Sequence, residues 1–259
     1  MSRPFSYAVF CLTAAFFALF FLWPFATTVR EAFFYTVAFT LDFVAQIFRD
    51  PLYLEGLVFA FLLALCSTLA SMLIAIPLAV VADRFLFPGK ALLSSLVLVP
   101  LILPPFVGAI GVKQILGREG ALNILLSKVG LVDRGAPPDW LGDGRFWGIV
   151  VMNALHLYPI LYLNITAALA NLDPAMEESA QNLGATGWRR FRRITLPLTM
   201  PGVFAGATIV FIWSFTELGV PLMFDYDRVT SVQIFNGIKD LSGNPLPYAL
   251  VAVMLMFSV

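Results

Sequence analysis

The spacing of charged residues constrains this sequence most: five stretches of 22 to 27 residues contain no Asp, Glu, Lys or Arg. A hydrocarbon core about 30 Å thick is crossed by about 20 residues of α-helix, so every stretch is long enough to span a bilayer. Helices satisfy all their backbone hydrogen bonds internally, as lipid requires. The stretches also lack the ten-residue alternation typical of transmembrane barrel strands.

These stretches predict an all-α fold, a polytopic transmembrane helix bundle of about six spans forming a single domain, residues 1–259. The expected spans are 5–29, 56–82, 91–112, 146–170, 202–224 and 246–259. Three prolines and two glycines within residues 99–111 predict that the third span is not a straight helix. We expect the last span to be incomplete, because the stretch from Pro247 to Val259 has only 13 residues, about 20 Å of helix. We expect the first to be an uncleaved helix, because its apolar run is longer than a typical signal-peptide core.

Composition supports this interpretation and excludes several function classes. Hydrophobic residues make up 60% of the chain and charged residues 12%, about half the charge of a soluble domain. The formal net charge is zero, which gives no basis for nucleic-acid binding. Cys11 and Cys66 lie within apolar runs and are expected to be packing residues, with neither a disulfide nor a metal site.

The distribution of Lys and Arg predicts the orientation in the membrane. With a cytoplasmic N-terminus, the inside segments 1–4, 83–90 and 171–200 hold seven basic residues in 42, and the outside segments hold nine in 80. Basic residues are denser inside, as the positive-inside rule requires. We therefore expect a multi-pass membrane protein with its N-terminus in the cytoplasm.

The loop 171–200 is the most informative segment. Asp173 followed by Pro174 is typical of a helix start, and Gly184 is suited to end that helix with a positive φ. Thr186 is expected to cap a second short helix, which carries an apolar face and four arginines: Arg189, Arg190, Arg192 and Arg193. One interpretation of this loop is an interfacial segment whose arginines contact anionic lipid.

The same loop resembles a known family. Glu178-Ser179-Ala180, followed by Gly184 and by Ile194-Thr195-Leu196-Pro197, is similar to the EAA loop of ABC importer permeases in every interval. Ser179 in place of alanine is the single departure, and it exchanges one small residue for another.

This resemblance implies a role for each matched residue. The helix from Glu178 to Leu183 would be a coupling helix docked on an ATP-binding subunit, and Gly184 would set the turn that follows it. The ATPase-coupling set implied in this loop is Glu177, Glu178, Ser179, Ala180, Gly184, Ile194, Leu196 and Pro197, of which the last three would anchor the second helix to the bundle.

The resemblance also implies a location in the plasma (inner) membrane of a prokaryote, and it implies the partners. They are a dimer of ATP-binding subunits, a second copy of the permease or a homologous one, an extracytoplasmic substrate-binding protein and the lipid bilayer. The chain has no G-x-x-x-x-G-K-[ST] sequence, so we expect it not to be an enzyme and to hold no cofactor, with ATP and Mg²⁺ bound by the partner subunit.

Three polar residues within the spans are candidates for the translocation path. Glu217 is an ionisable residue within a predicted span, where a carboxylate is costly and usually faces a cavity or a partner. It also fits a position near the outer end of its span or a structural hydrogen bond. Asn153 and His156 share one helix face, where interhelical hydrogen bonding and pore lining are both open. No metal-ligand pattern accompanies them.

The sequence thus predicts the permease subunit of an ABC importer, which forms the translocation path and couples it to ATP hydrolysis by a partner. The alternative is an ion-coupled secondary carrier that uses Glu217. The region around 217–224 looks similar to permeases of the ferric-iron, polyamine and oxyanion group, and we expect ferric iron as the substrate.

Overall fold

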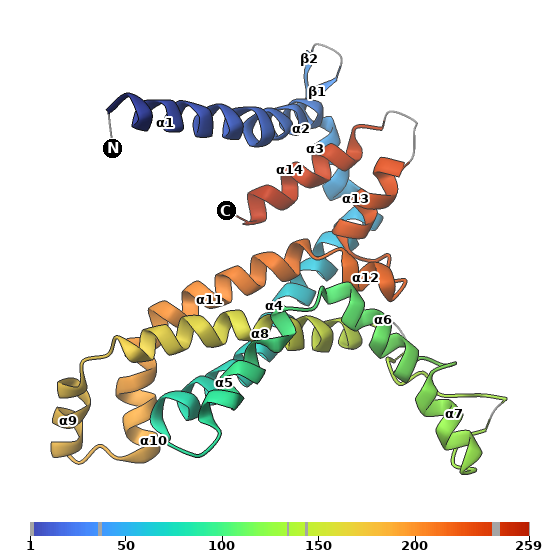
Figure 1. Cartoon of the computed structure of the whole chain (residues 1–259). Helices are drawn as coiled ribbons and strands as arrows, with labels where there is room; N and C mark the ends of the chain where they lie inside the picture. Colours follow the sequence, from blue (N-terminus) through green and yellow to red (C-terminus); the bar gives the residue numbers. More distant parts are fainter. Residues whose placement is uncertain (1–2, 36–37, 134, 143–144, 240–243, 259) are drawn as a thin grey trace. The chain divides into compact units, whose positions relative to one another are not determined.

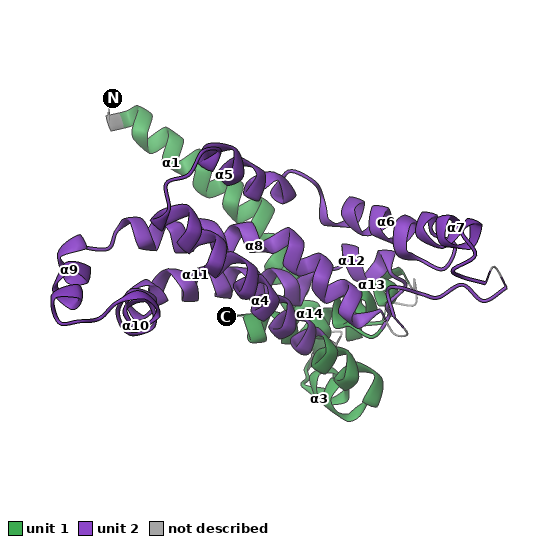
Figure 2. Ribbon diagram, turned by 90° about the horizontal axis from the view of Figure 1, so that it is seen from below, with its two compact units in different colours: residues 1–59, 228–259 green, residues 60–227 purple. Residues whose placement is uncertain are grey.

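The computed structural model of the chain describes residues 3–35, 38–133, 135–142, 145–239 and 244–258. Within these ranges the chain is almost entirely helical (Figure 1). It divides into two compact units, residues 1–59 with 228–259 (unit 1) and residues 60–227 (unit 2) (Figure 2). Helix α4, Pro51–Arg84, contributes to both. All candidate coupling and pathway residues lie in unit 2.

Unit 1 begins with a continuous apolar helix, Pro4–Phe33, whose most apolar 18 residues are not buried, although Ala32 near its end is. Helix α14 packs against α2 and α3, and two short antiparallel strands follow α2. The elements are α1 (Arg3–Phe17), η1 (Ala18–Leu22), α2 (Trp23–Phe33), β1 (Phe34–Tyr35), β2 (Ala38–Phe39), α3 (Asp42–Arg49), α13 (Thr230–Lys239) and α14 (Leu246–Ser258).

Unit 2 contains the rest of α4 and the helices that carry the candidate sites. In chain order these are α5 (Lys90–Leu98), η2 (Val99–Leu101), α6 (Pro105–Leu116), α7 (Ala121–Lys128), α8 (Phe146–Ala170), α9 (Pro174–Asn182), α10 (Gly187–Arg190), η3 (Phe191–Thr195), α11 (Leu196–Thr216) and α12 (Gly219–Met223). Helices α9 and α10 lie at one end of the unit and α6, α7 and α12 toward the other (Figures 1 and 2).

The expected bundle of apolar helices is confirmed, and so is the interruption of its third span, whereas its fifth span is shorter than predicted. Among the described residues four helices are long and apolar enough to cross a membrane, and a bent pair makes a fifth candidate. In that pair, the third predicted span, the two parts meet at 92° because Pro104 and Pro105 interrupt the helix. The fifth span was expected to reach 224, but its helix ends at Thr216.

The core of unit 2 depends on close packing between α8 and α11. A Cβ atom built on Gly202 would lie 2.5 Å from the Ala168 Cβ, and one on Gly206 would lie 3.1 Å from the Asn164 Cβ. Two glycines four residues apart therefore let the backbones of two spans approach, as small residues do in membrane helix pairs. This contact fixes α11, and with it the loop that precedes α11.

Candidate coupling loop and translocation pathway

The first helix of the loop begins and ends as the sequence predicts. The Asp173 side chain accepts a hydrogen bond of 2.9 Å from the Ala175 backbone N–H, and Pro174 occupies the first helical position. The helix ends before Gly184, which has a φ of +80°. A side chain there would strain the backbone, since residues other than glycine rarely adopt this conformation.

The second helix begins after Thr186, but the Thr186 side chain makes no capping hydrogen bond. The predicted helix start is right and the predicted cap is wrong. From Gly187 the chain stays helical to Thr216, passing through the π-helical turn η3. Ile194, Leu196 and Pro197 therefore lie within a continuous helix that leads into the span, consistent with the anchoring position implied for them.

Glu177 lies on the inner side of α9, where it joins three elements. The two terminal guanidinium nitrogens of Arg84, at the end of α4, both donate to its carboxylate. The Thr195 hydroxyl of η3 donates to the same carboxylate at 2.7 Å. The Oδ2 atom of Asp83 lies 3.2 Å from the Nε atom of Arg84. We call Arg84, Glu177 and Thr195 the strut, because they tie the loop to the end of α4.

The strut is an ionic contact at neutral pH. Hydrogen bonding from Arg84, with that of Thr195 and the positive charge of Arg84, holds the pKa of Glu177 below its usual value against the opposing effect of burial. Paired charges with several hydrogen bonds are the arrangement in which a largely buried carboxylate is retained.

The neighbouring residues of α9 divide between two faces. Ala180 is 7% exposed and lies inward like Glu177, whereas Glu178 and Ser179 are exposed. The Ser179 hydroxyl donates to the Ala175 carbonyl of its own helix. Leu183 at the end of the helix is 89% exposed. Of the predicted coupling residues on α9, two therefore lie inward and two lie outward.

Glu217 lies at the break between α11 and α12. Its Oε1 accepts hydrogen bonds from the backbone N–H groups of Gly219 at 2.8 Å and Val220 at 3.2 Å. The carboxylate therefore satisfies donors at the start of α12, a structural role that carboxylates commonly take. The sequence left Glu217 either within the span 202–224 or near its outer end, and the structure places it where α11 ends. Gly219 and Pro221, which follow it, are residues that allow such an interruption.

Asn153 and His156 of α8 have different surroundings. The Asn153 amide donates to the Ser214 hydroxyl of α11 at 2.9 Å, and both residues are buried. The half-buried His156 lies beside the backbone carbonyl of Pro100 and near the charge of Glu217. Asn153 therefore joins two spans, and His156 lies close to the interruptions of two others.

Those two interruptions lie side by side. A Cβ atom on Gly219 would be 3.3 Å from the Phe106 Cβ, so the start of α12 contacts the start of α6. Broken helices at membrane depth occur where protein or a water-filled cavity surrounds the irregular backbone. The structure brings Glu217 and His156 to this junction and leaves Asn153 in the adjacent helix interface.

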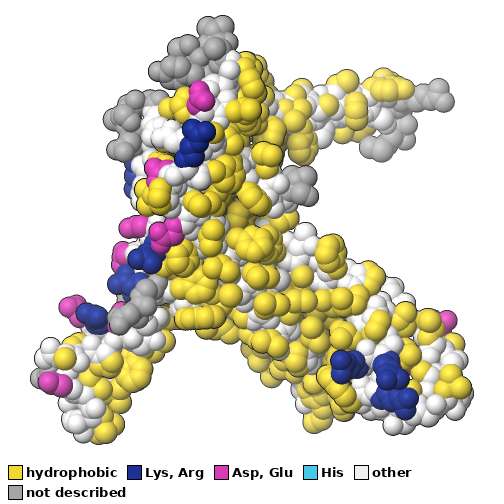
Figure 3. All heavy atoms as spheres, turned by 180° about the vertical axis from the view of Figure 1, so that it is seen from behind, with side chains coloured by type: hydrophobic (Ala, Val, Ile, Leu, Met, Phe, Trp, Pro, Cys, Tyr) yellow, Lys and Arg dark blue, Asp and Glu magenta, His cyan; other side chains and the backbone are white. Residues whose placement is uncertain are grey.

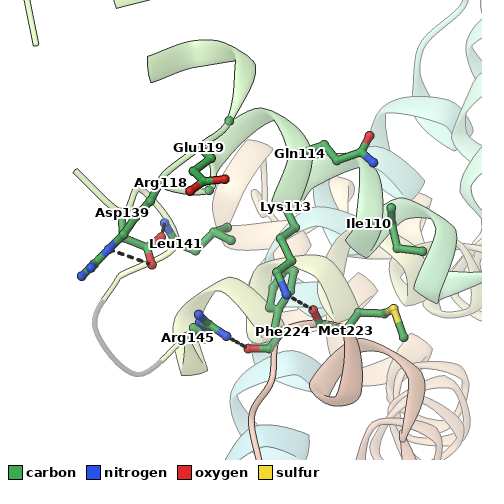
Figure 4. Close-up of a pocket in the computed structure, with 12 residues that line it drawn as sticks. Ile110, Lys113, Gln114, Arg118, Glu119, Asp139, Leu141, Arg145, Met223 and Phe224 are labelled. Atoms are coloured by element: carbon green, nitrogen blue, oxygen red, sulfur yellow. Dashed lines mark hydrogen bonds and ion pairs between the residues drawn. The ribbon is translucent and has the colours of Figure 1, made fainter. Parts of the chain in front are cut away.

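A cluster that the sequence analysis missed lies at the other end of unit 2, and Figure 4 shows two of its members, Lys113 and Arg145. Lys113 donates to the Met223 carbonyl at 2.8 Å and to Asp225 at 2.6 Å. Arg145 donates to the Phe224 carbonyl and to Asp225, the latter at 2.8 Å. We call Lys113, Arg145 and Asp225 the clamp. It lies at a cavity of about 590 Å³, whose lining includes Lys113 and Arg145.

The signal for the clamp was weak in the sequence. Asp225 has a φ of +51°, a conformation that Asp tolerates better than most residues, but its partners are 80 and 112 positions away. The hydrogen bond from Lys113, with that from Arg145, lowers the pKa of Asp225. Among the described residues, no three His, Cys, Asp or Glu side chains gather in a way that could hold a metal ion.

Comparison with known proteins identifies the family. Residues 75–259 match the binding-protein-dependent transport system inner membrane components. The chain belongs to this family and is a permease subunit of an ABC importer, a multi-pass protein of the inner membrane.

Two relatives are molybdenum transport system permease proteins. The one from Haemophilus influenzae is 35% identical over 169 residues, covering 62% of this chain and 69% of the relative. The one from Escherichia coli is 37% identical over 144 residues, covering 54% of this chain and 58% of the relative. A spermidine/putrescine transport system permease of Escherichia coli is 31% identical over 185 residues, covering 71% of this chain and 66% of the relative.

A solved structure has the same fold over nearly the whole chain. A membrane component of a bacterial ABC transporter involved in alginate import superposes with a TM-score of 0.77 at 21% identity, covering 98% of this chain and 92% of that one. The expectation of ferric iron finds no support, because the relatives described above are named for molybdenum and for spermidine and putrescine.

Proposed function

We propose that this chain, working as one permease domain, forms half of a substrate translocation path and couples it to ATP hydrolysis in a separate subunit. The observation that carries this proposal is the division of α9 into two faces. Glu177 and Ala180 hold the helix against the bundle, and Glu178, Ser179 and Leu183 are left exposed. A helix held on one side and exposed on the other is suited to transmit movement from a partner.

In this proposal the loop docks on an ATP-binding subunit that carries ATP and Mg²⁺ on the cytoplasmic side. The EAA resemblance supports that partner. Closure of the ATPase dimer would move α9 as a rigid body, and the strut would pass the movement to α4. A second permease, identical or homologous, completes the path.

The opposite end of unit 2 would then face an extracytoplasmic binding protein. The family's dependence on binding proteins supports this partner, and one solved structure of similar fold was determined with a substrate-bound periplasmic protein. Substrate choice would be made largely by that protein. Glu217, His156 and Asn153 are proposed to line or support the path near the junction of the two broken spans.

Site-directed cross-linking tests the docking surface. A cysteine at Ser179 or Leu183 should form a cross-link to the ATP-binding subunit, with an efficiency that changes between ATP-bound and nucleotide-free states. A cysteine at Ser127, at the other end of unit 2, is the control and should not. Absence of a cross-link from both loop positions in an active transporter would contradict the proposal.

The carrier alternative makes the opposite prediction. Uptake by a carrier would follow an ion gradient and survive ATP depletion, and Glu217→Gln would abolish it. In our proposal uptake stops without ATP. The capping bonds that Glu217 makes to α12 favour a structural or path-supporting role over an ion-coupling one.

A further inference from the structure

An apolar groove of about 530 Å³ lies at the base of the coupling loop, between the last turns of α4 and the segment α10–η3. Its floor and walls are mostly hydrophobic, from Ile76, Pro77, Val80, Val81, Phe85 and Phe191. Trp188 also lines it, 72% exposed, with its ring centroid 5.2 Å from that of Phe191. An open groove with an aromatic wall suits a flexible apolar chain.

Positive charge on the rim of the groove indicates that the ligand also carries an anionic group. Arg84 and Arg190 both line the groove, but Arg84 is already engaged by Glu177 and Asp83. The Arg190 side chain makes no ion pair within the described part of the chain, and neither do those of its neighbours Arg189, Arg192 and Arg193. Lys and Arg side chains gather over this end of unit 2 in Figure 3. The rim therefore attracts an anion.

The position of the groove along α4 favours a lipid over a soluble partner as its ligand. Ile76 belongs to a helix long and apolar enough to span the membrane, eight residues before its end at Arg84, which places it about 12 Å along the helix from that end. An acyl chain reaches that depth, whereas Arg190 lies in the loop 171–200, in the first turn of its second helix. Aromatic side chains such as Trp188 favour the boundary between these two levels.

We propose that this groove binds a membrane phospholipid with an anionic headgroup, whose phosphate contacts Arg190 and whose acyl chain lies against α4. Basic pockets beside apolar surface on the cytoplasmic side are suited to such lipids. The bound lipid would fill the space behind the strut, and the loop would sense the composition of the inner leaflet. This goes beyond the proposed transport function.

Brominated lipids test the site, because bromine quenches nearby tryptophan. The full-length chain, purified with its accompanying subunits, is placed in nanodiscs containing brominated phosphatidylglycerol or brominated phosphatidylcholine at equal mole fraction. The Trp188 signal is the difference between the wild type and Trp188→Phe. Across a matched series of mole fractions, the anionic lipid should reach half-maximal quenching at about one fifth of the mole fraction that phosphatidylcholine needs, the effect of one basic residue near the membrane surface.

Three variants separate this site from general charge attraction. Arg190→Gln should abolish the preference for the anionic lipid, whereas Arg192→Gln, the same change two residues away and outside the groove lining, should keep it. Val81→Phe at an exposed wall position should reduce quenching by filling the groove. Equal quenching by both lipids, equal effects of the two arginine variants, or no quenching by either lipid, as when a protein subunit covers the groove, would overturn the proposal.

Discussion

Each end of unit 2 has a carboxylate paired with basic side chains, but the two carboxylates differ in their exposure to water. At the loop end, the strut places Glu177 between Arg84 and Thr195, and at the other end the clamp places Asp225 between Lys113 and Arg145. The Glu177 side chain is 10% exposed and that of Asp225 is 66% exposed. Water screens the charges of the exposed ion pair and competes for its hydrogen bonds. The exposed contact therefore stabilises the fold less than the buried one.

This difference suits two mechanical tasks. A largely buried ion pair with an extra hydroxyl donor resists separation, because either partner left alone would lose hydrogen bonds that water cannot fully replace. An exposed pair can exchange partners at little cost. We therefore infer that the strut is a fixed connection, whereas the clamp can release the segment after α12 when a partner protein docks.

The largest effect is expected from Glu177→Gln. Loss of the charge removes strong hydrogen bonds and leaves Arg84 without its main partner, lowering the free energy of unfolding by about 2 kcal/mol. Thermal unfolding of the purified protein measures this loss, and transport-coupled ATPase activity should fall with it. The control Glu178→Gln removes an exposed charge from the same helix and should leave stability unchanged.

A double-mutant cycle sharpens this result. If the strut is one unit, adding Arg84→Gln to Glu177→Gln should lower stability much less than Arg84→Gln does alone. Fully additive losses, or a Glu177→Gln protein as stable as the wild type, would show that the inner face of α9 does not hold the loop.

Gly184→Val is expected to have the next largest effect. No atom lies within 4 Å of a Cβ built there, so the expected cost of about 1–2 kcal/mol comes from forcing an L-residue into the left-handed conformation. The turn should shift and uncouple ATP hydrolysis from transport. Gly184→Asn is the matched control, because Asn tolerates this conformation. Equal coupling in the two variants would remove the turn from the mechanism.

The sequence was sufficient for features set by local chemistry. Asp173, Pro174 and Gly184 define a helix and its ends through interactions within a few residues, and the structure has that helix. The long uncharged stretches likewise predicted most spans. The prolines of the third span indicated its interruption, although the 92° bend depends on packing that a single segment does not encode.

Features set by distant partners were not predictable. Glu177 and Glu178 are adjacent and chemically alike, and only the position of Arg84, 93 residues away, determines which one lies inward. The spacing of Glu177 and Ala180 on one face was a weak signal. For Glu217 the sequence contained the breaking residues, but the predicted span continued through the apolar residues 218–224, past the true helix end at Thr216.

A smaller effect is expected from breaking the hydrogen bond that Asn153 donates to Ser214, which lies between the two ends of unit 2. Asn153→Ala should lower stability by about 0.6 kcal/mol, an average value for hydrogen bonds between membrane helices. The matched variant Ser214→Ala breaks the same bond from the other side. Equal losses in stability and transport would indicate a structural bond, whereas a selective loss of transport in Asn153→Ala would place Asn153 on the path.

The smallest effect is expected from Asp225→Asn, which removes the clamp's charge and keeps a residue suited to a positive φ. At physiological salt the loss should be about 0.5 kcal/mol or less, and it should fade as ionic strength rises. Because the pKa of Asp225 is lowered in the folded protein, its contribution is fully present above its ordinary value of about 4 and is lost only as pH falls through the lower folded value. Thermal unfolding of wild type and variant should therefore differ by a constant small amount between about pH 5 and 8. A loss as large as that of Glu177→Gln, or one insensitive to salt, would mean that the two ends do not differ in the way their exposure indicates.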